Sequence, residues 1–277
     1  MTNTARPTQA ARAIAAAQLL AACLGLVSVF GLAGCASGAS KAAADPVTAA
    51  DDSDARKRAR VRLELAVGYF EQGKTDIALE ELKQTLTIDP TLGEAYNMRG
   101  LIYMRLGNNP AAEDSFRRSA SLNPRDADTQ HNLGWLLCQE ARYDEAQRSF
   151  DAALANPQYG GRSKTMMTQG VCFVRAGKFD DAERTLARAY ELDPGNPVTS
   201  YNYANLLYRR GENARAQFII RQLNNSELAN AESLWLGIKV ERRLSDGMAM
   251  RQLGETLTKR FGSSREARAF GRGAWDE

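Results

Sequence analysis

Histidine is almost absent from the sequence: His131 is the only one among 277 residues. A metal site built from several histidines and an HExxH zinc motif are therefore excluded. The chain also has no glycine-rich phosphate loop, no GxSxG nucleophile turn and no Cys-x-x-Cys pair. We therefore expect no enzyme activity, no metal and no cofactor, and we interpret His131 as a polar contact rather than a catalyst.

A strong excess of charge of one sign is also absent. The 36 basic and 33 acidic residues give a net charge of +3, and two of the basic ones, Arg6 and Arg12, fall in an N-terminal segment that we expect to be removed. The remaining 34 basic residues nearly balance the acidic ones. Mixed, balanced charge gives no electrostatic attraction to nucleic acid. Neither nucleic acid nor a small-molecule substrate is expected as a partner.

Residues 1–34 have the pattern of a lipoprotein signal peptide. Two arginines precede a segment without charge, 13–32, and small residues then lead to Cys35. In the bacterial lipobox, the thiol of such a cysteine receives a diacylglycerol and becomes the first mature residue. We therefore predict lipidation at Cys35.

Two alternatives to this assignment are an uncleaved membrane helix and a second lipobox that ends at Cys23. Cleavage before Cys23 would leave the apolar segment 24–32 on the mature chain, which disfavours it. Ala36 follows the preferred site, and the absence of an aspartate there indicates the periplasmic face of the outer membrane. Several acyl chains would anchor the protein stably, and we expect 35–58 to form the lipidated cysteine and a flexible tether.

A spacing of 34 residues recurs through the rest of the chain. The second repeat shows it clearly: Gly100 is at place 8, Ala112 at place 20, Phe116 at place 24 and Pro124 at place 32. The predicted repeats are 59–92, 93–126, 127–160, 163–196, 197–230 and 231–264, followed by a tail, 265–277. The sixth is weak, because Met250 and Gly254 stand where alanine and a large residue are expected.

The marker positions indicate pairs of packed helices. A small residue at place 8 and the alanine at place 20 are expected to face each other, so that two antiparallel helices approach closely. Glycines such as Gly107 allow the left-handed turn between the two helices, and the proline ends the second helix. The pattern is that of tetratricopeptide repeats. It predicts an all-α superhelix of about six helix-turn-helix repeats, which forms a curved surface that binds other proteins.

Two further cysteines, Cys138 and Cys172, fall at places 12 and 10 of adjacent repeats. An oxidising periplasm would permit a disulfide between them. These two places point to different sides of a first helix, however, and we therefore expect two buried free thiols.

The concave side of such a superhelix is lined by places 2, 5, 9 and 12 of each first helix. In this chain most of these places are apolar or aromatic, which indicates an interaction surface. The predicted groove residues are Leu63, Phe70, Asn97, Leu101, Met104, His131, Trp135, Met167, Tyr201, Asn205, Tyr208 and Trp235. We expect exposed contacts above all from Trp135, Tyr201, Tyr208 and Trp235, and a groove suited to an apolar or extended segment.

The combination of signal, tether and repeats resembles the PilF/PilW family of type IV pilus biogenesis lipoproteins. The strongest similarity lies in 132–138, 142–146, 150–159 and 169–172, with a further match at 234–238. The early Pro157, the inserted Gly161 and Arg162, and both repeat cysteines are similar to that family's pattern. Gln169 and Gly262 depart from it.

This resemblance implies a pilotin, a protein that binds secretin subunits and promotes their localisation and multimerisation in the outer membrane. The resemblance supplies a binding region and no active site. The alternative is a general periplasmic scaffold lipoprotein that serves barrel assembly or acts as an adaptor for a peptidoglycan enzyme.

Overall fold

The protein consists of helices throughout the part that the structure describes. The computed structural model describes residues 53–275, which fall in one compact unit (Ala49–Glu277). These residues form thirteen helices and no strand, so the predicted all-α class is confirmed. The signal peptide, Cys23, Cys35 and the tether up to residue 52 lie outside the described residues. Between residues 53 and 275, no helix has the length and hydrophobicity that crossing a membrane requires.

Twelve of the helices form six consecutive pairs. The first and second helices of these pairs are α2 (Asp54–Glu71) and α3 (Thr75–Ile88), α4 (Gly93–Arg105) and α5 (Asn109–Leu122), α6 (Ala127–Gln139) and α7 (Tyr143–Leu154), α8 (Arg162–Arg175) and α9 (Phe179–Leu192), α10 (Pro197–Arg209) and α11 (Asn213–Asn224), and α12 (Ala231–Arg243) and α13 (Gly247–Phe261). The last helix, α14 (Arg265–Arg272), follows the sixth pair.

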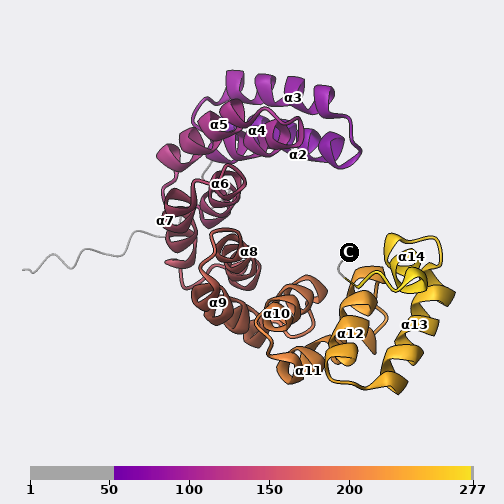
Figure 1. Ribbon diagram of the computed structural model, residues 1–277. Helices are drawn as coiled ribbons and strands as arrows, with labels where there is room; N and C mark the ends of the chain where they lie inside the picture. Colours follow the sequence, from indigo (N-terminus) through magenta and orange to yellow (C-terminus); the bar gives the residue numbers. More distant parts are fainter. Residues whose placement is uncertain (1–52, 276–277) are drawn as a thin grey trace, which may run out of the picture. The chain divides into compact units, whose positions relative to one another are not determined.

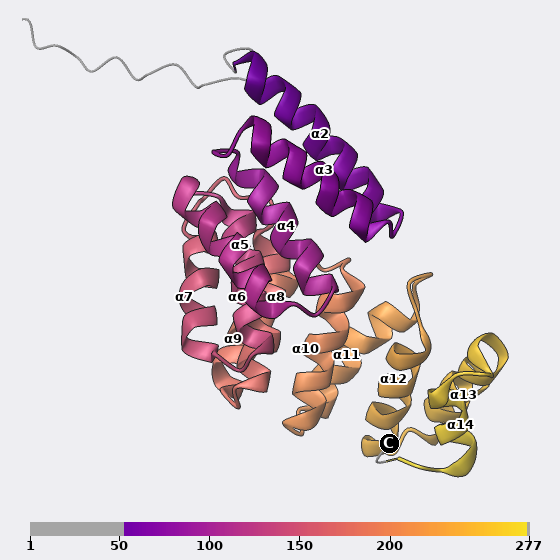
Figure 2. The ribbon, with the colours of Figure 1, turned by 90° about the horizontal axis from the view of Figure 1, so that it is seen from above.

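The pairs stack side by side along a curve (Figures 1 and 2). Each first helix contacts the second helix of the preceding pair and the first helix of the next one. In Figure 1, α6, α8, α10 and α12 line the inner side of the curve, and α7, α9, α11 and α13 lie on its outer side. The tetratricopeptide-repeat superhelix that the 34-residue period predicts is thus confirmed.

In the repeats that have glycine at place 8, this small residue leaves room for a large side chain of the second helix. A Cβ added to Gly100 would lie 2.5 Å from the Phe116 ring, and one added to Gly134 would lie 2.8 Å from the Phe150 ring. These rings stand at place 24. We expected the alanine at place 20 to face the glycine, but the atoms nearest to the glycine belong to the larger residue.

The turn inside each repeat needs a left-handed residue. Gly73, Gly107, Gly177 and Gly211 have φ values of 77°, 72°, 72° and 80°, as their type and position predict. In the third repeat, Ala141 adopts the same conformation with φ 60°.

The amino-terminal boundary differs from the prediction. Helix α2 begins at Asp54, where the Ser53 hydroxyl accepts a hydrogen bond from the Arg56 backbone N–H at 3.2 Å. The prediction of a flexible tether up to residue 58 is therefore wrong for 54–58. The serine cap lengthens the first helix beyond the start of the repeat pattern.

The carboxyl-terminal segment also differs from the prediction, because the expected tail contains α14. A Cβ added to Gly254, at place 24 of the sixth repeat, would lie 2.0 Å from the ring of Phe270 in α14. Phe270 therefore fills the space that a large residue at place 24 fills in the other repeats. The weak sixth repeat is completed by the helix that follows it.

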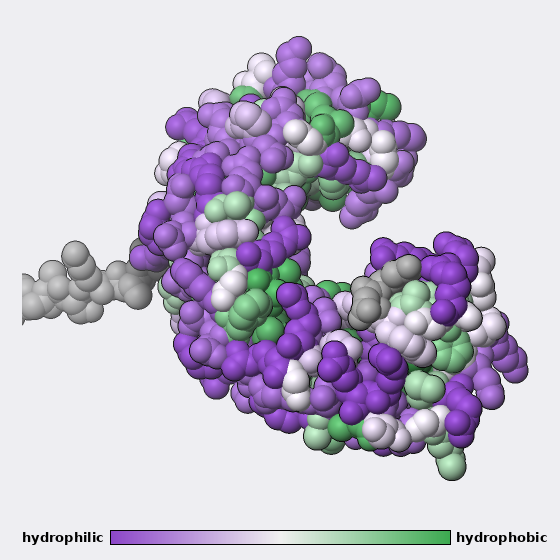
Figure 3. All heavy atoms as spheres, viewed as in Figure 1, coloured by the Kyte–Doolittle hydropathy of each residue, from purple (hydrophilic) through white to green (hydrophobic). Residues whose placement is uncertain are grey.

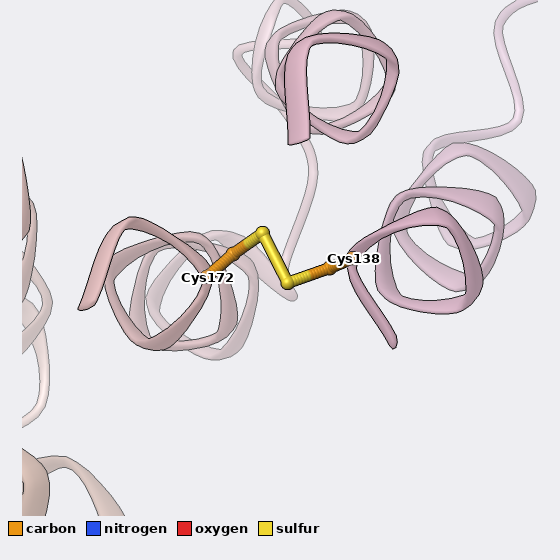
Figure 4. Close-up of a disulfide and its surroundings, with 2 residues drawn as sticks. All are labelled: Cys138 and Cys172. Carbon is orange, nitrogen blue, oxygen red and sulfur yellow. A yellow bond between two sulfur atoms is a disulfide. The ribbon is translucent and has the colours of Figure 1, made fainter. Parts of the chain in front are cut away.

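Cys138 of α6 and Cys172 of α8 form a disulfide, with their Cα atoms 5.9 Å apart (Figure 4). The prediction of two free thiols is wrong. Because of the insertion before α8, the two cysteines stand at places 12 and 10 although they are 34 residues apart. They meet because α6 and α8 pack with an offset of about two residues, which also brings His131 at place 5 to Thr165 at place 3. The bond covalently joins the third and fourth repeats.

His131 adds a polar contact at the same junction. Its Nδ1 atom lies 2.9 Å from the Thr165 hydroxyl of α8, and its ring meets the edge of Phe150 at a centroid distance of 6.2 Å. The imidazole is buried, and burial lowers its pKa to about 4, because removal from water disfavours the charged form. His131 is thus neutral at neutral pH.

We predict that Gly134→Ala destabilises the protein by roughly 1–3 kcal/mol, because the added methyl group forces the Phe150 ring to move. The urea midpoint, followed by circular dichroism, measures this loss. Gly68→Ala is the matched control, since no atom lies within 4 Å of a Cβ added there. This control should gain about 0.5–1 kcal/mol, and equal effects of the two changes would contradict the packing assigned to place 8.

Reduction of the disulfide should lower the stability of the third and fourth repeats. Opening a loop of this length costs roughly 3–4 kcal/mol in the chain-entropy treatment. A reductant should therefore lower the urea midpoint of the wild type. The double variant Cys138→Ser/Cys172→Ser should start from the lower value and show no response to the reductant.

His131 should make stability depend on pH below neutrality. Its folded-state pKa of about 4 lies below the unfolded value of 6.5, so the unfolded chain binds the proton first as the pH falls. Stability is therefore full above pH 6.5 and is lost between pH 6.5 and 4, by about 2 kcal/mol at pH 5. His131→Gln should remove most of this slope in urea unfolding. A slope that is unchanged in the variant would assign the effect to other groups.

Candidate functional site

The inner side carries an apolar pocket that extends across three consecutive first helices. Figure 3 shows hydrophobic surface gathered over α8 on the inside of the curve. The pocket has a volume of about 430 Å³ and is lined by His131, Asn132 and Trp135 of α6, Lys164, Met167, Thr168 and Val171 of α8, and Val198 and Asn202 of α10. It is open to solvent on one side and apolar at its floor, which suits a protein side chain or an extended segment.

The helical repeat explains why these side chains meet. α6 contacts α8, and α8 contacts α10, so residues near place 5 and place 9 of successive first helices lie next to one another. Trp135 and Val171 share place 9 of their repeats, while His131 and Met167 share place 5. The disulfide and the bond between His131 and Thr165 hold α6 against α8 beside this pocket.

The twelve predicted groove residues differ in their burial and in the pockets that they line. Ten of them are half-buried, and His131 and Trp235 are buried, each 5% exposed. The pocket brings together His131, Trp135 and Met167. A second pocket brings together Tyr201, Asn205 and Trp235. The other six, Leu63, Phe70, Asn97, Leu101, Met104 and Tyr208, line neither pocket.

Several of the apolar groove residues also pack between repeats. Leu63 and Phe70 lie against the core of the first two repeats, Trp135 against that of the second to fourth, and Tyr208 against that of the fourth to sixth. Their exposed portions are therefore presented by a fixed packing arrangement. Pre-positioned aromatic groups lose little conformational entropy when a partner binds.

Trp235 does not contribute the exposed contact that we expected. The ring of Trp275 stacks on it with centroids 5.6 Å apart and an angle of 18° between the planes. The Arg242 guanidinium lies over the outer indole, 4.7 Å from its centroid. The carboxyl-terminal segment therefore covers Trp235, the aromatic residue of the sixth repeat that we expected to contact a partner.

The second pocket, of about 210 Å³, lies between α10, α12 and α14 and is polar. It is lined by Tyr201, Asn205, Glu232, Trp235, Leu236, Lys239, Arg265, Glu266 and Ala269. Burial raises the pKa of Tyr201, and the carboxylates of Glu232 and Glu266 raise it further. The phenol therefore stays protonated at neutral pH and is available as a hydrogen-bond donor.

Polar groups of the inner side also bond to one another. The Asn132 side chain donates to the side-chain oxygen of Asn97 at 3.0 Å, which links α6 to α4. The phenol of Tyr159, in the loop before α8, donates to Asp128 at 3.0 Å. Burial raises the pKa of Tyr159 to about 12. The first of these bonds holds the side chain of Asn132, which lines the pocket.

One set of residues on the first helices was not predicted from the sequence. α4, α8, α10 and α12 each end on an arginine, and we call Arg105, Arg175, Arg209 and Arg243 the arginine row. All four are exposed, and each lies over an aromatic ring of the preceding repeat. They share place 13 of the repeat. Reading charges by repeat place, rather than as a net sum, would have found them.

No cluster of three or more histidine, cysteine or carboxylate side chains suited to a metal ion occurs within 53–275. Many carboxylates of the described residues instead form ion pairs with arginine or lysine. Asp89 is an example: its hydrogen bond from the Arg56 guanidinium, at 2.6 Å, holds its pKa at about 2.

The segments that match known protein families coincide with the repeats. Sequence profiles described as tetratricopeptide repeat match 93–126, 131–197 and 173–234, and a profile described as TPR repeat matches 68–107. Together these matches extend from the first repeat to the start of the sixth.

Among curated proteins, the chain is similar to the type IV pilus assembly protein PilF of Pseudomonas aeruginosa. The two are 25% identical over 208 residues, which cover 75% of this chain and 82% of PilF. An uncharacterised protein of Haemophilus influenzae is 26% identical over 144 residues, which cover 52% of this chain and 80% of that protein.

Two solved structures match over most of their length. The crystal structure of PilW, described as a widely conserved type IV pilus biogenesis factor, is 28% identical, with a TM-score of 0.70, and the match covers 76% of this chain and 97% of PilW. The structure of Pseudomonas aeruginosa PilF is 25% identical, with a TM-score of 0.70, covering 79% and 99%. The chain therefore belongs to the tetratricopeptide-repeat family of type IV pilus biogenesis proteins that includes PilF and PilW.

Proposed function

We propose that this protein is an outer-membrane lipoprotein that binds secretin subunits and promotes their multimerisation in type IV pilus biogenesis. The observation that carries the proposal is the similarity to PilF and PilW, which extends over about three quarters of this chain. The names of those proteins place them in pilus assembly and biogenesis. The proposed role is to hold another protein, and it requires no catalysis.

The inner side of the stack is the proposed binding surface. Its pocket combines the half-buried Trp135 with Met167 and Val171, and surfaces that join apolar area to an aromatic anchor commonly bind partner proteins. Tyr201 and Asn205 extend this surface towards the sixth repeat. An extended or apolar segment of the secretin subunit would lie along these first helices.

The proposed anchor is a set of acyl chains on Cys35, which lies outside the described residues. Two or three chains hold a protein on a bilayer far more stably than one. Ala36 favours the outer membrane over the inner one. A bound secretin subunit would thus be brought to the membrane in which it assembles.

Deletion of the gene in the native strain should deplete heat-resistant secretin multimers and abolish pilus-dependent motility. Complementation with Cys35→Ser should leave the protein outside the outer-membrane fraction and restore few multimers. Cys23→Ser is the matched control and should behave as the wild type, because it alters the disfavoured lipobox. Normal multimers in the deletion strain would exclude the secretin role and favour a general periplasmic scaffold.

A second arm of this experiment tests the binding surface. Trp135→Ala should lower the recovery of secretin with the detergent-extracted protein by about tenfold or more, since a central aromatic anchor commonly contributes about 2 kcal/mol. Phe218→Ala is the control, because Phe218 is 63% exposed on the second helix α11 and lies outside the pocket. Equal losses in the two variants would argue against the inner side.

A further inference from the structure

The arginine row differs from the other arginines of the protein in what it contacts. Among the described residues, Arg105, Arg175, Arg209 and Arg243 form no ion pair with a carboxylate. Their guanidinium carbons lie over the rings of Phe70, Trp135, Phe179 and Tyr208, at 5.0, 4.9, 5.9 and 5.8 Å from the ring centroids.

Arg210, which follows Arg209 in the chain, shows the contrast. Arg210 bonds to Asp180 at 2.7 Å and lies 3.1 Å from a Glu183 oxygen, and its pKa is raised by these carboxylates. Arg209, beside it, stacks on Phe179 instead. Stacking on a ring fixes the guanidinium plane but leaves its N–H edge able to donate. Arg105 uses one N–H group within the chain, since its Nη1 donates to the Phe70 carbonyl at 3.3 Å. The row therefore presents oriented donors, chiefly from Arg175, Arg209 and Arg243, whose charge no carboxylate of the described residues neutralises.

The helix dipole alone does not account for this distribution. A basic residue in the last turn of a helix interacts favourably with the carboxyl-terminal end of the dipole. That effect should apply equally to the second helices, yet α3, α5, α7 and α9 have no basic residue in their last turns, and among the six second helices only α11 and α13 have one. An arginine ends four of the six first helices.

The row also runs beside apolar surface. Arg175 lies over Trp135, which lines the apolar pocket, and Arg243 lies over Tyr208. Neighbouring helices pack about 8–10 Å apart, and a chain in the extended polyproline II conformation advances about 3.1 Å per residue and returns to the same side at every third residue. An acidic residue at about every third position would therefore meet successive arginines of α8, α10 and α12.

We propose that the arginine row binds the carboxylates of an extended protein segment in which an acidic residue recurs at about every third position, with apolar side chains between them directed to the adjacent pocket. Charge complementarity selects this occupant, because planar guanidinium groups with free N–H edges bind carboxylates bidentately. The inference deepens the proposed function by naming the chemistry of the bound segment.

The test uses the full-length chain, purified in a mild detergent, and a short fluorescein-labelled peptide that repeats Asp-Leu-Ser. A peptide that repeats Asn-Leu-Ser serves as the comparison. Fluorescence anisotropy should show saturable binding of the acidic peptide, about tenfold weaker binding of the amide peptide, and weakening of the former at high salt.

The variant Arg175→Gln/Arg209→Gln should lower the affinity for the acidic peptide by about tenfold or more. Glutamine already occupies the equivalent place in the third repeat, at Gln139, so the fold accommodates it. Arg184→Gln/Arg188→Gln is the matched control, because it removes the same charge from the second helix α9. There Arg184 pairs with Asp181 and Arg188 pairs with Glu191. The control should bind the peptide within about twofold of the wild type.

Three results would overturn the inference: no saturable binding of the acidic peptide, equal binding of the two peptides, or equal losses in the two double variants. Vesicles of phosphatidylcholine and phosphatidylglycerol provide a further arm. If Arg175→Gln/Arg209→Gln weakens sedimentation with these vesicles and leaves peptide binding intact, the row binds anionic lipid and the inference is wrong. Each of these failures would leave the dependence of secretin multimers on the protein untouched, so the two proposals are tested separately.

Discussion

The close approach of two helices within each repeat is the constraint on which the rest of the structure depends. Glycine at place 8 lets a ring or a leucine from place 24 lie directly on the helix backbone, as Phe150 does on Gly134 and Leu186 on Gly170. The pair then has a fixed shape, and a stack of such pairs curves regularly, because each contacts only its neighbours. The inner side, its pocket and its arginine row all follow from that regularity.

The same constraint explains how the stack ends. The sixth repeat has Gly254 at place 24 and Ile238 at place 8, so the usual small and large residues are missing. Phe270 of α14 supplies the missing ring, and Trp275 then covers Trp235. A terminal repeat has no following neighbour, and its exposed face must be covered by something else. The carboxyl-terminal segment covers this face, and it thereby buries Trp235, an aromatic residue of the inner side.

The helix pairs could be predicted from the sequence because the marker residues are the ones that make the contacts within each pair. The features that escaped prediction depend on contacts outside the repeat pattern. Ser53 extends α2 by a local cap, and the disulfide depends on the offset between α6 and α8, which sets place 12 of one helix beside place 10 of the next. The burial of Trp235 depends on Trp275, a residue 40 positions away that no repeat place describes.

The arginines show how one residue type acquires two roles from its place in the repeat. Arg142 joins Glu113 of the preceding repeat to Glu145 of its own, and Arg221 holds the buried carboxylate of Glu241 in the next repeat. These pairs neutralise charge while they tie repeats together. The four arginines at place 13 form no ion pair with a carboxylate of the described residues, and each stacks on a ring of the preceding repeat and keeps its charge. The nearly neutral composition therefore conceals a separation, in which charge is balanced at the contacts between repeats and left unbalanced at the ends of the helices that line the inner side. A neutral chain of this kind attracts an acidic segment locally without attracting polyanions in general.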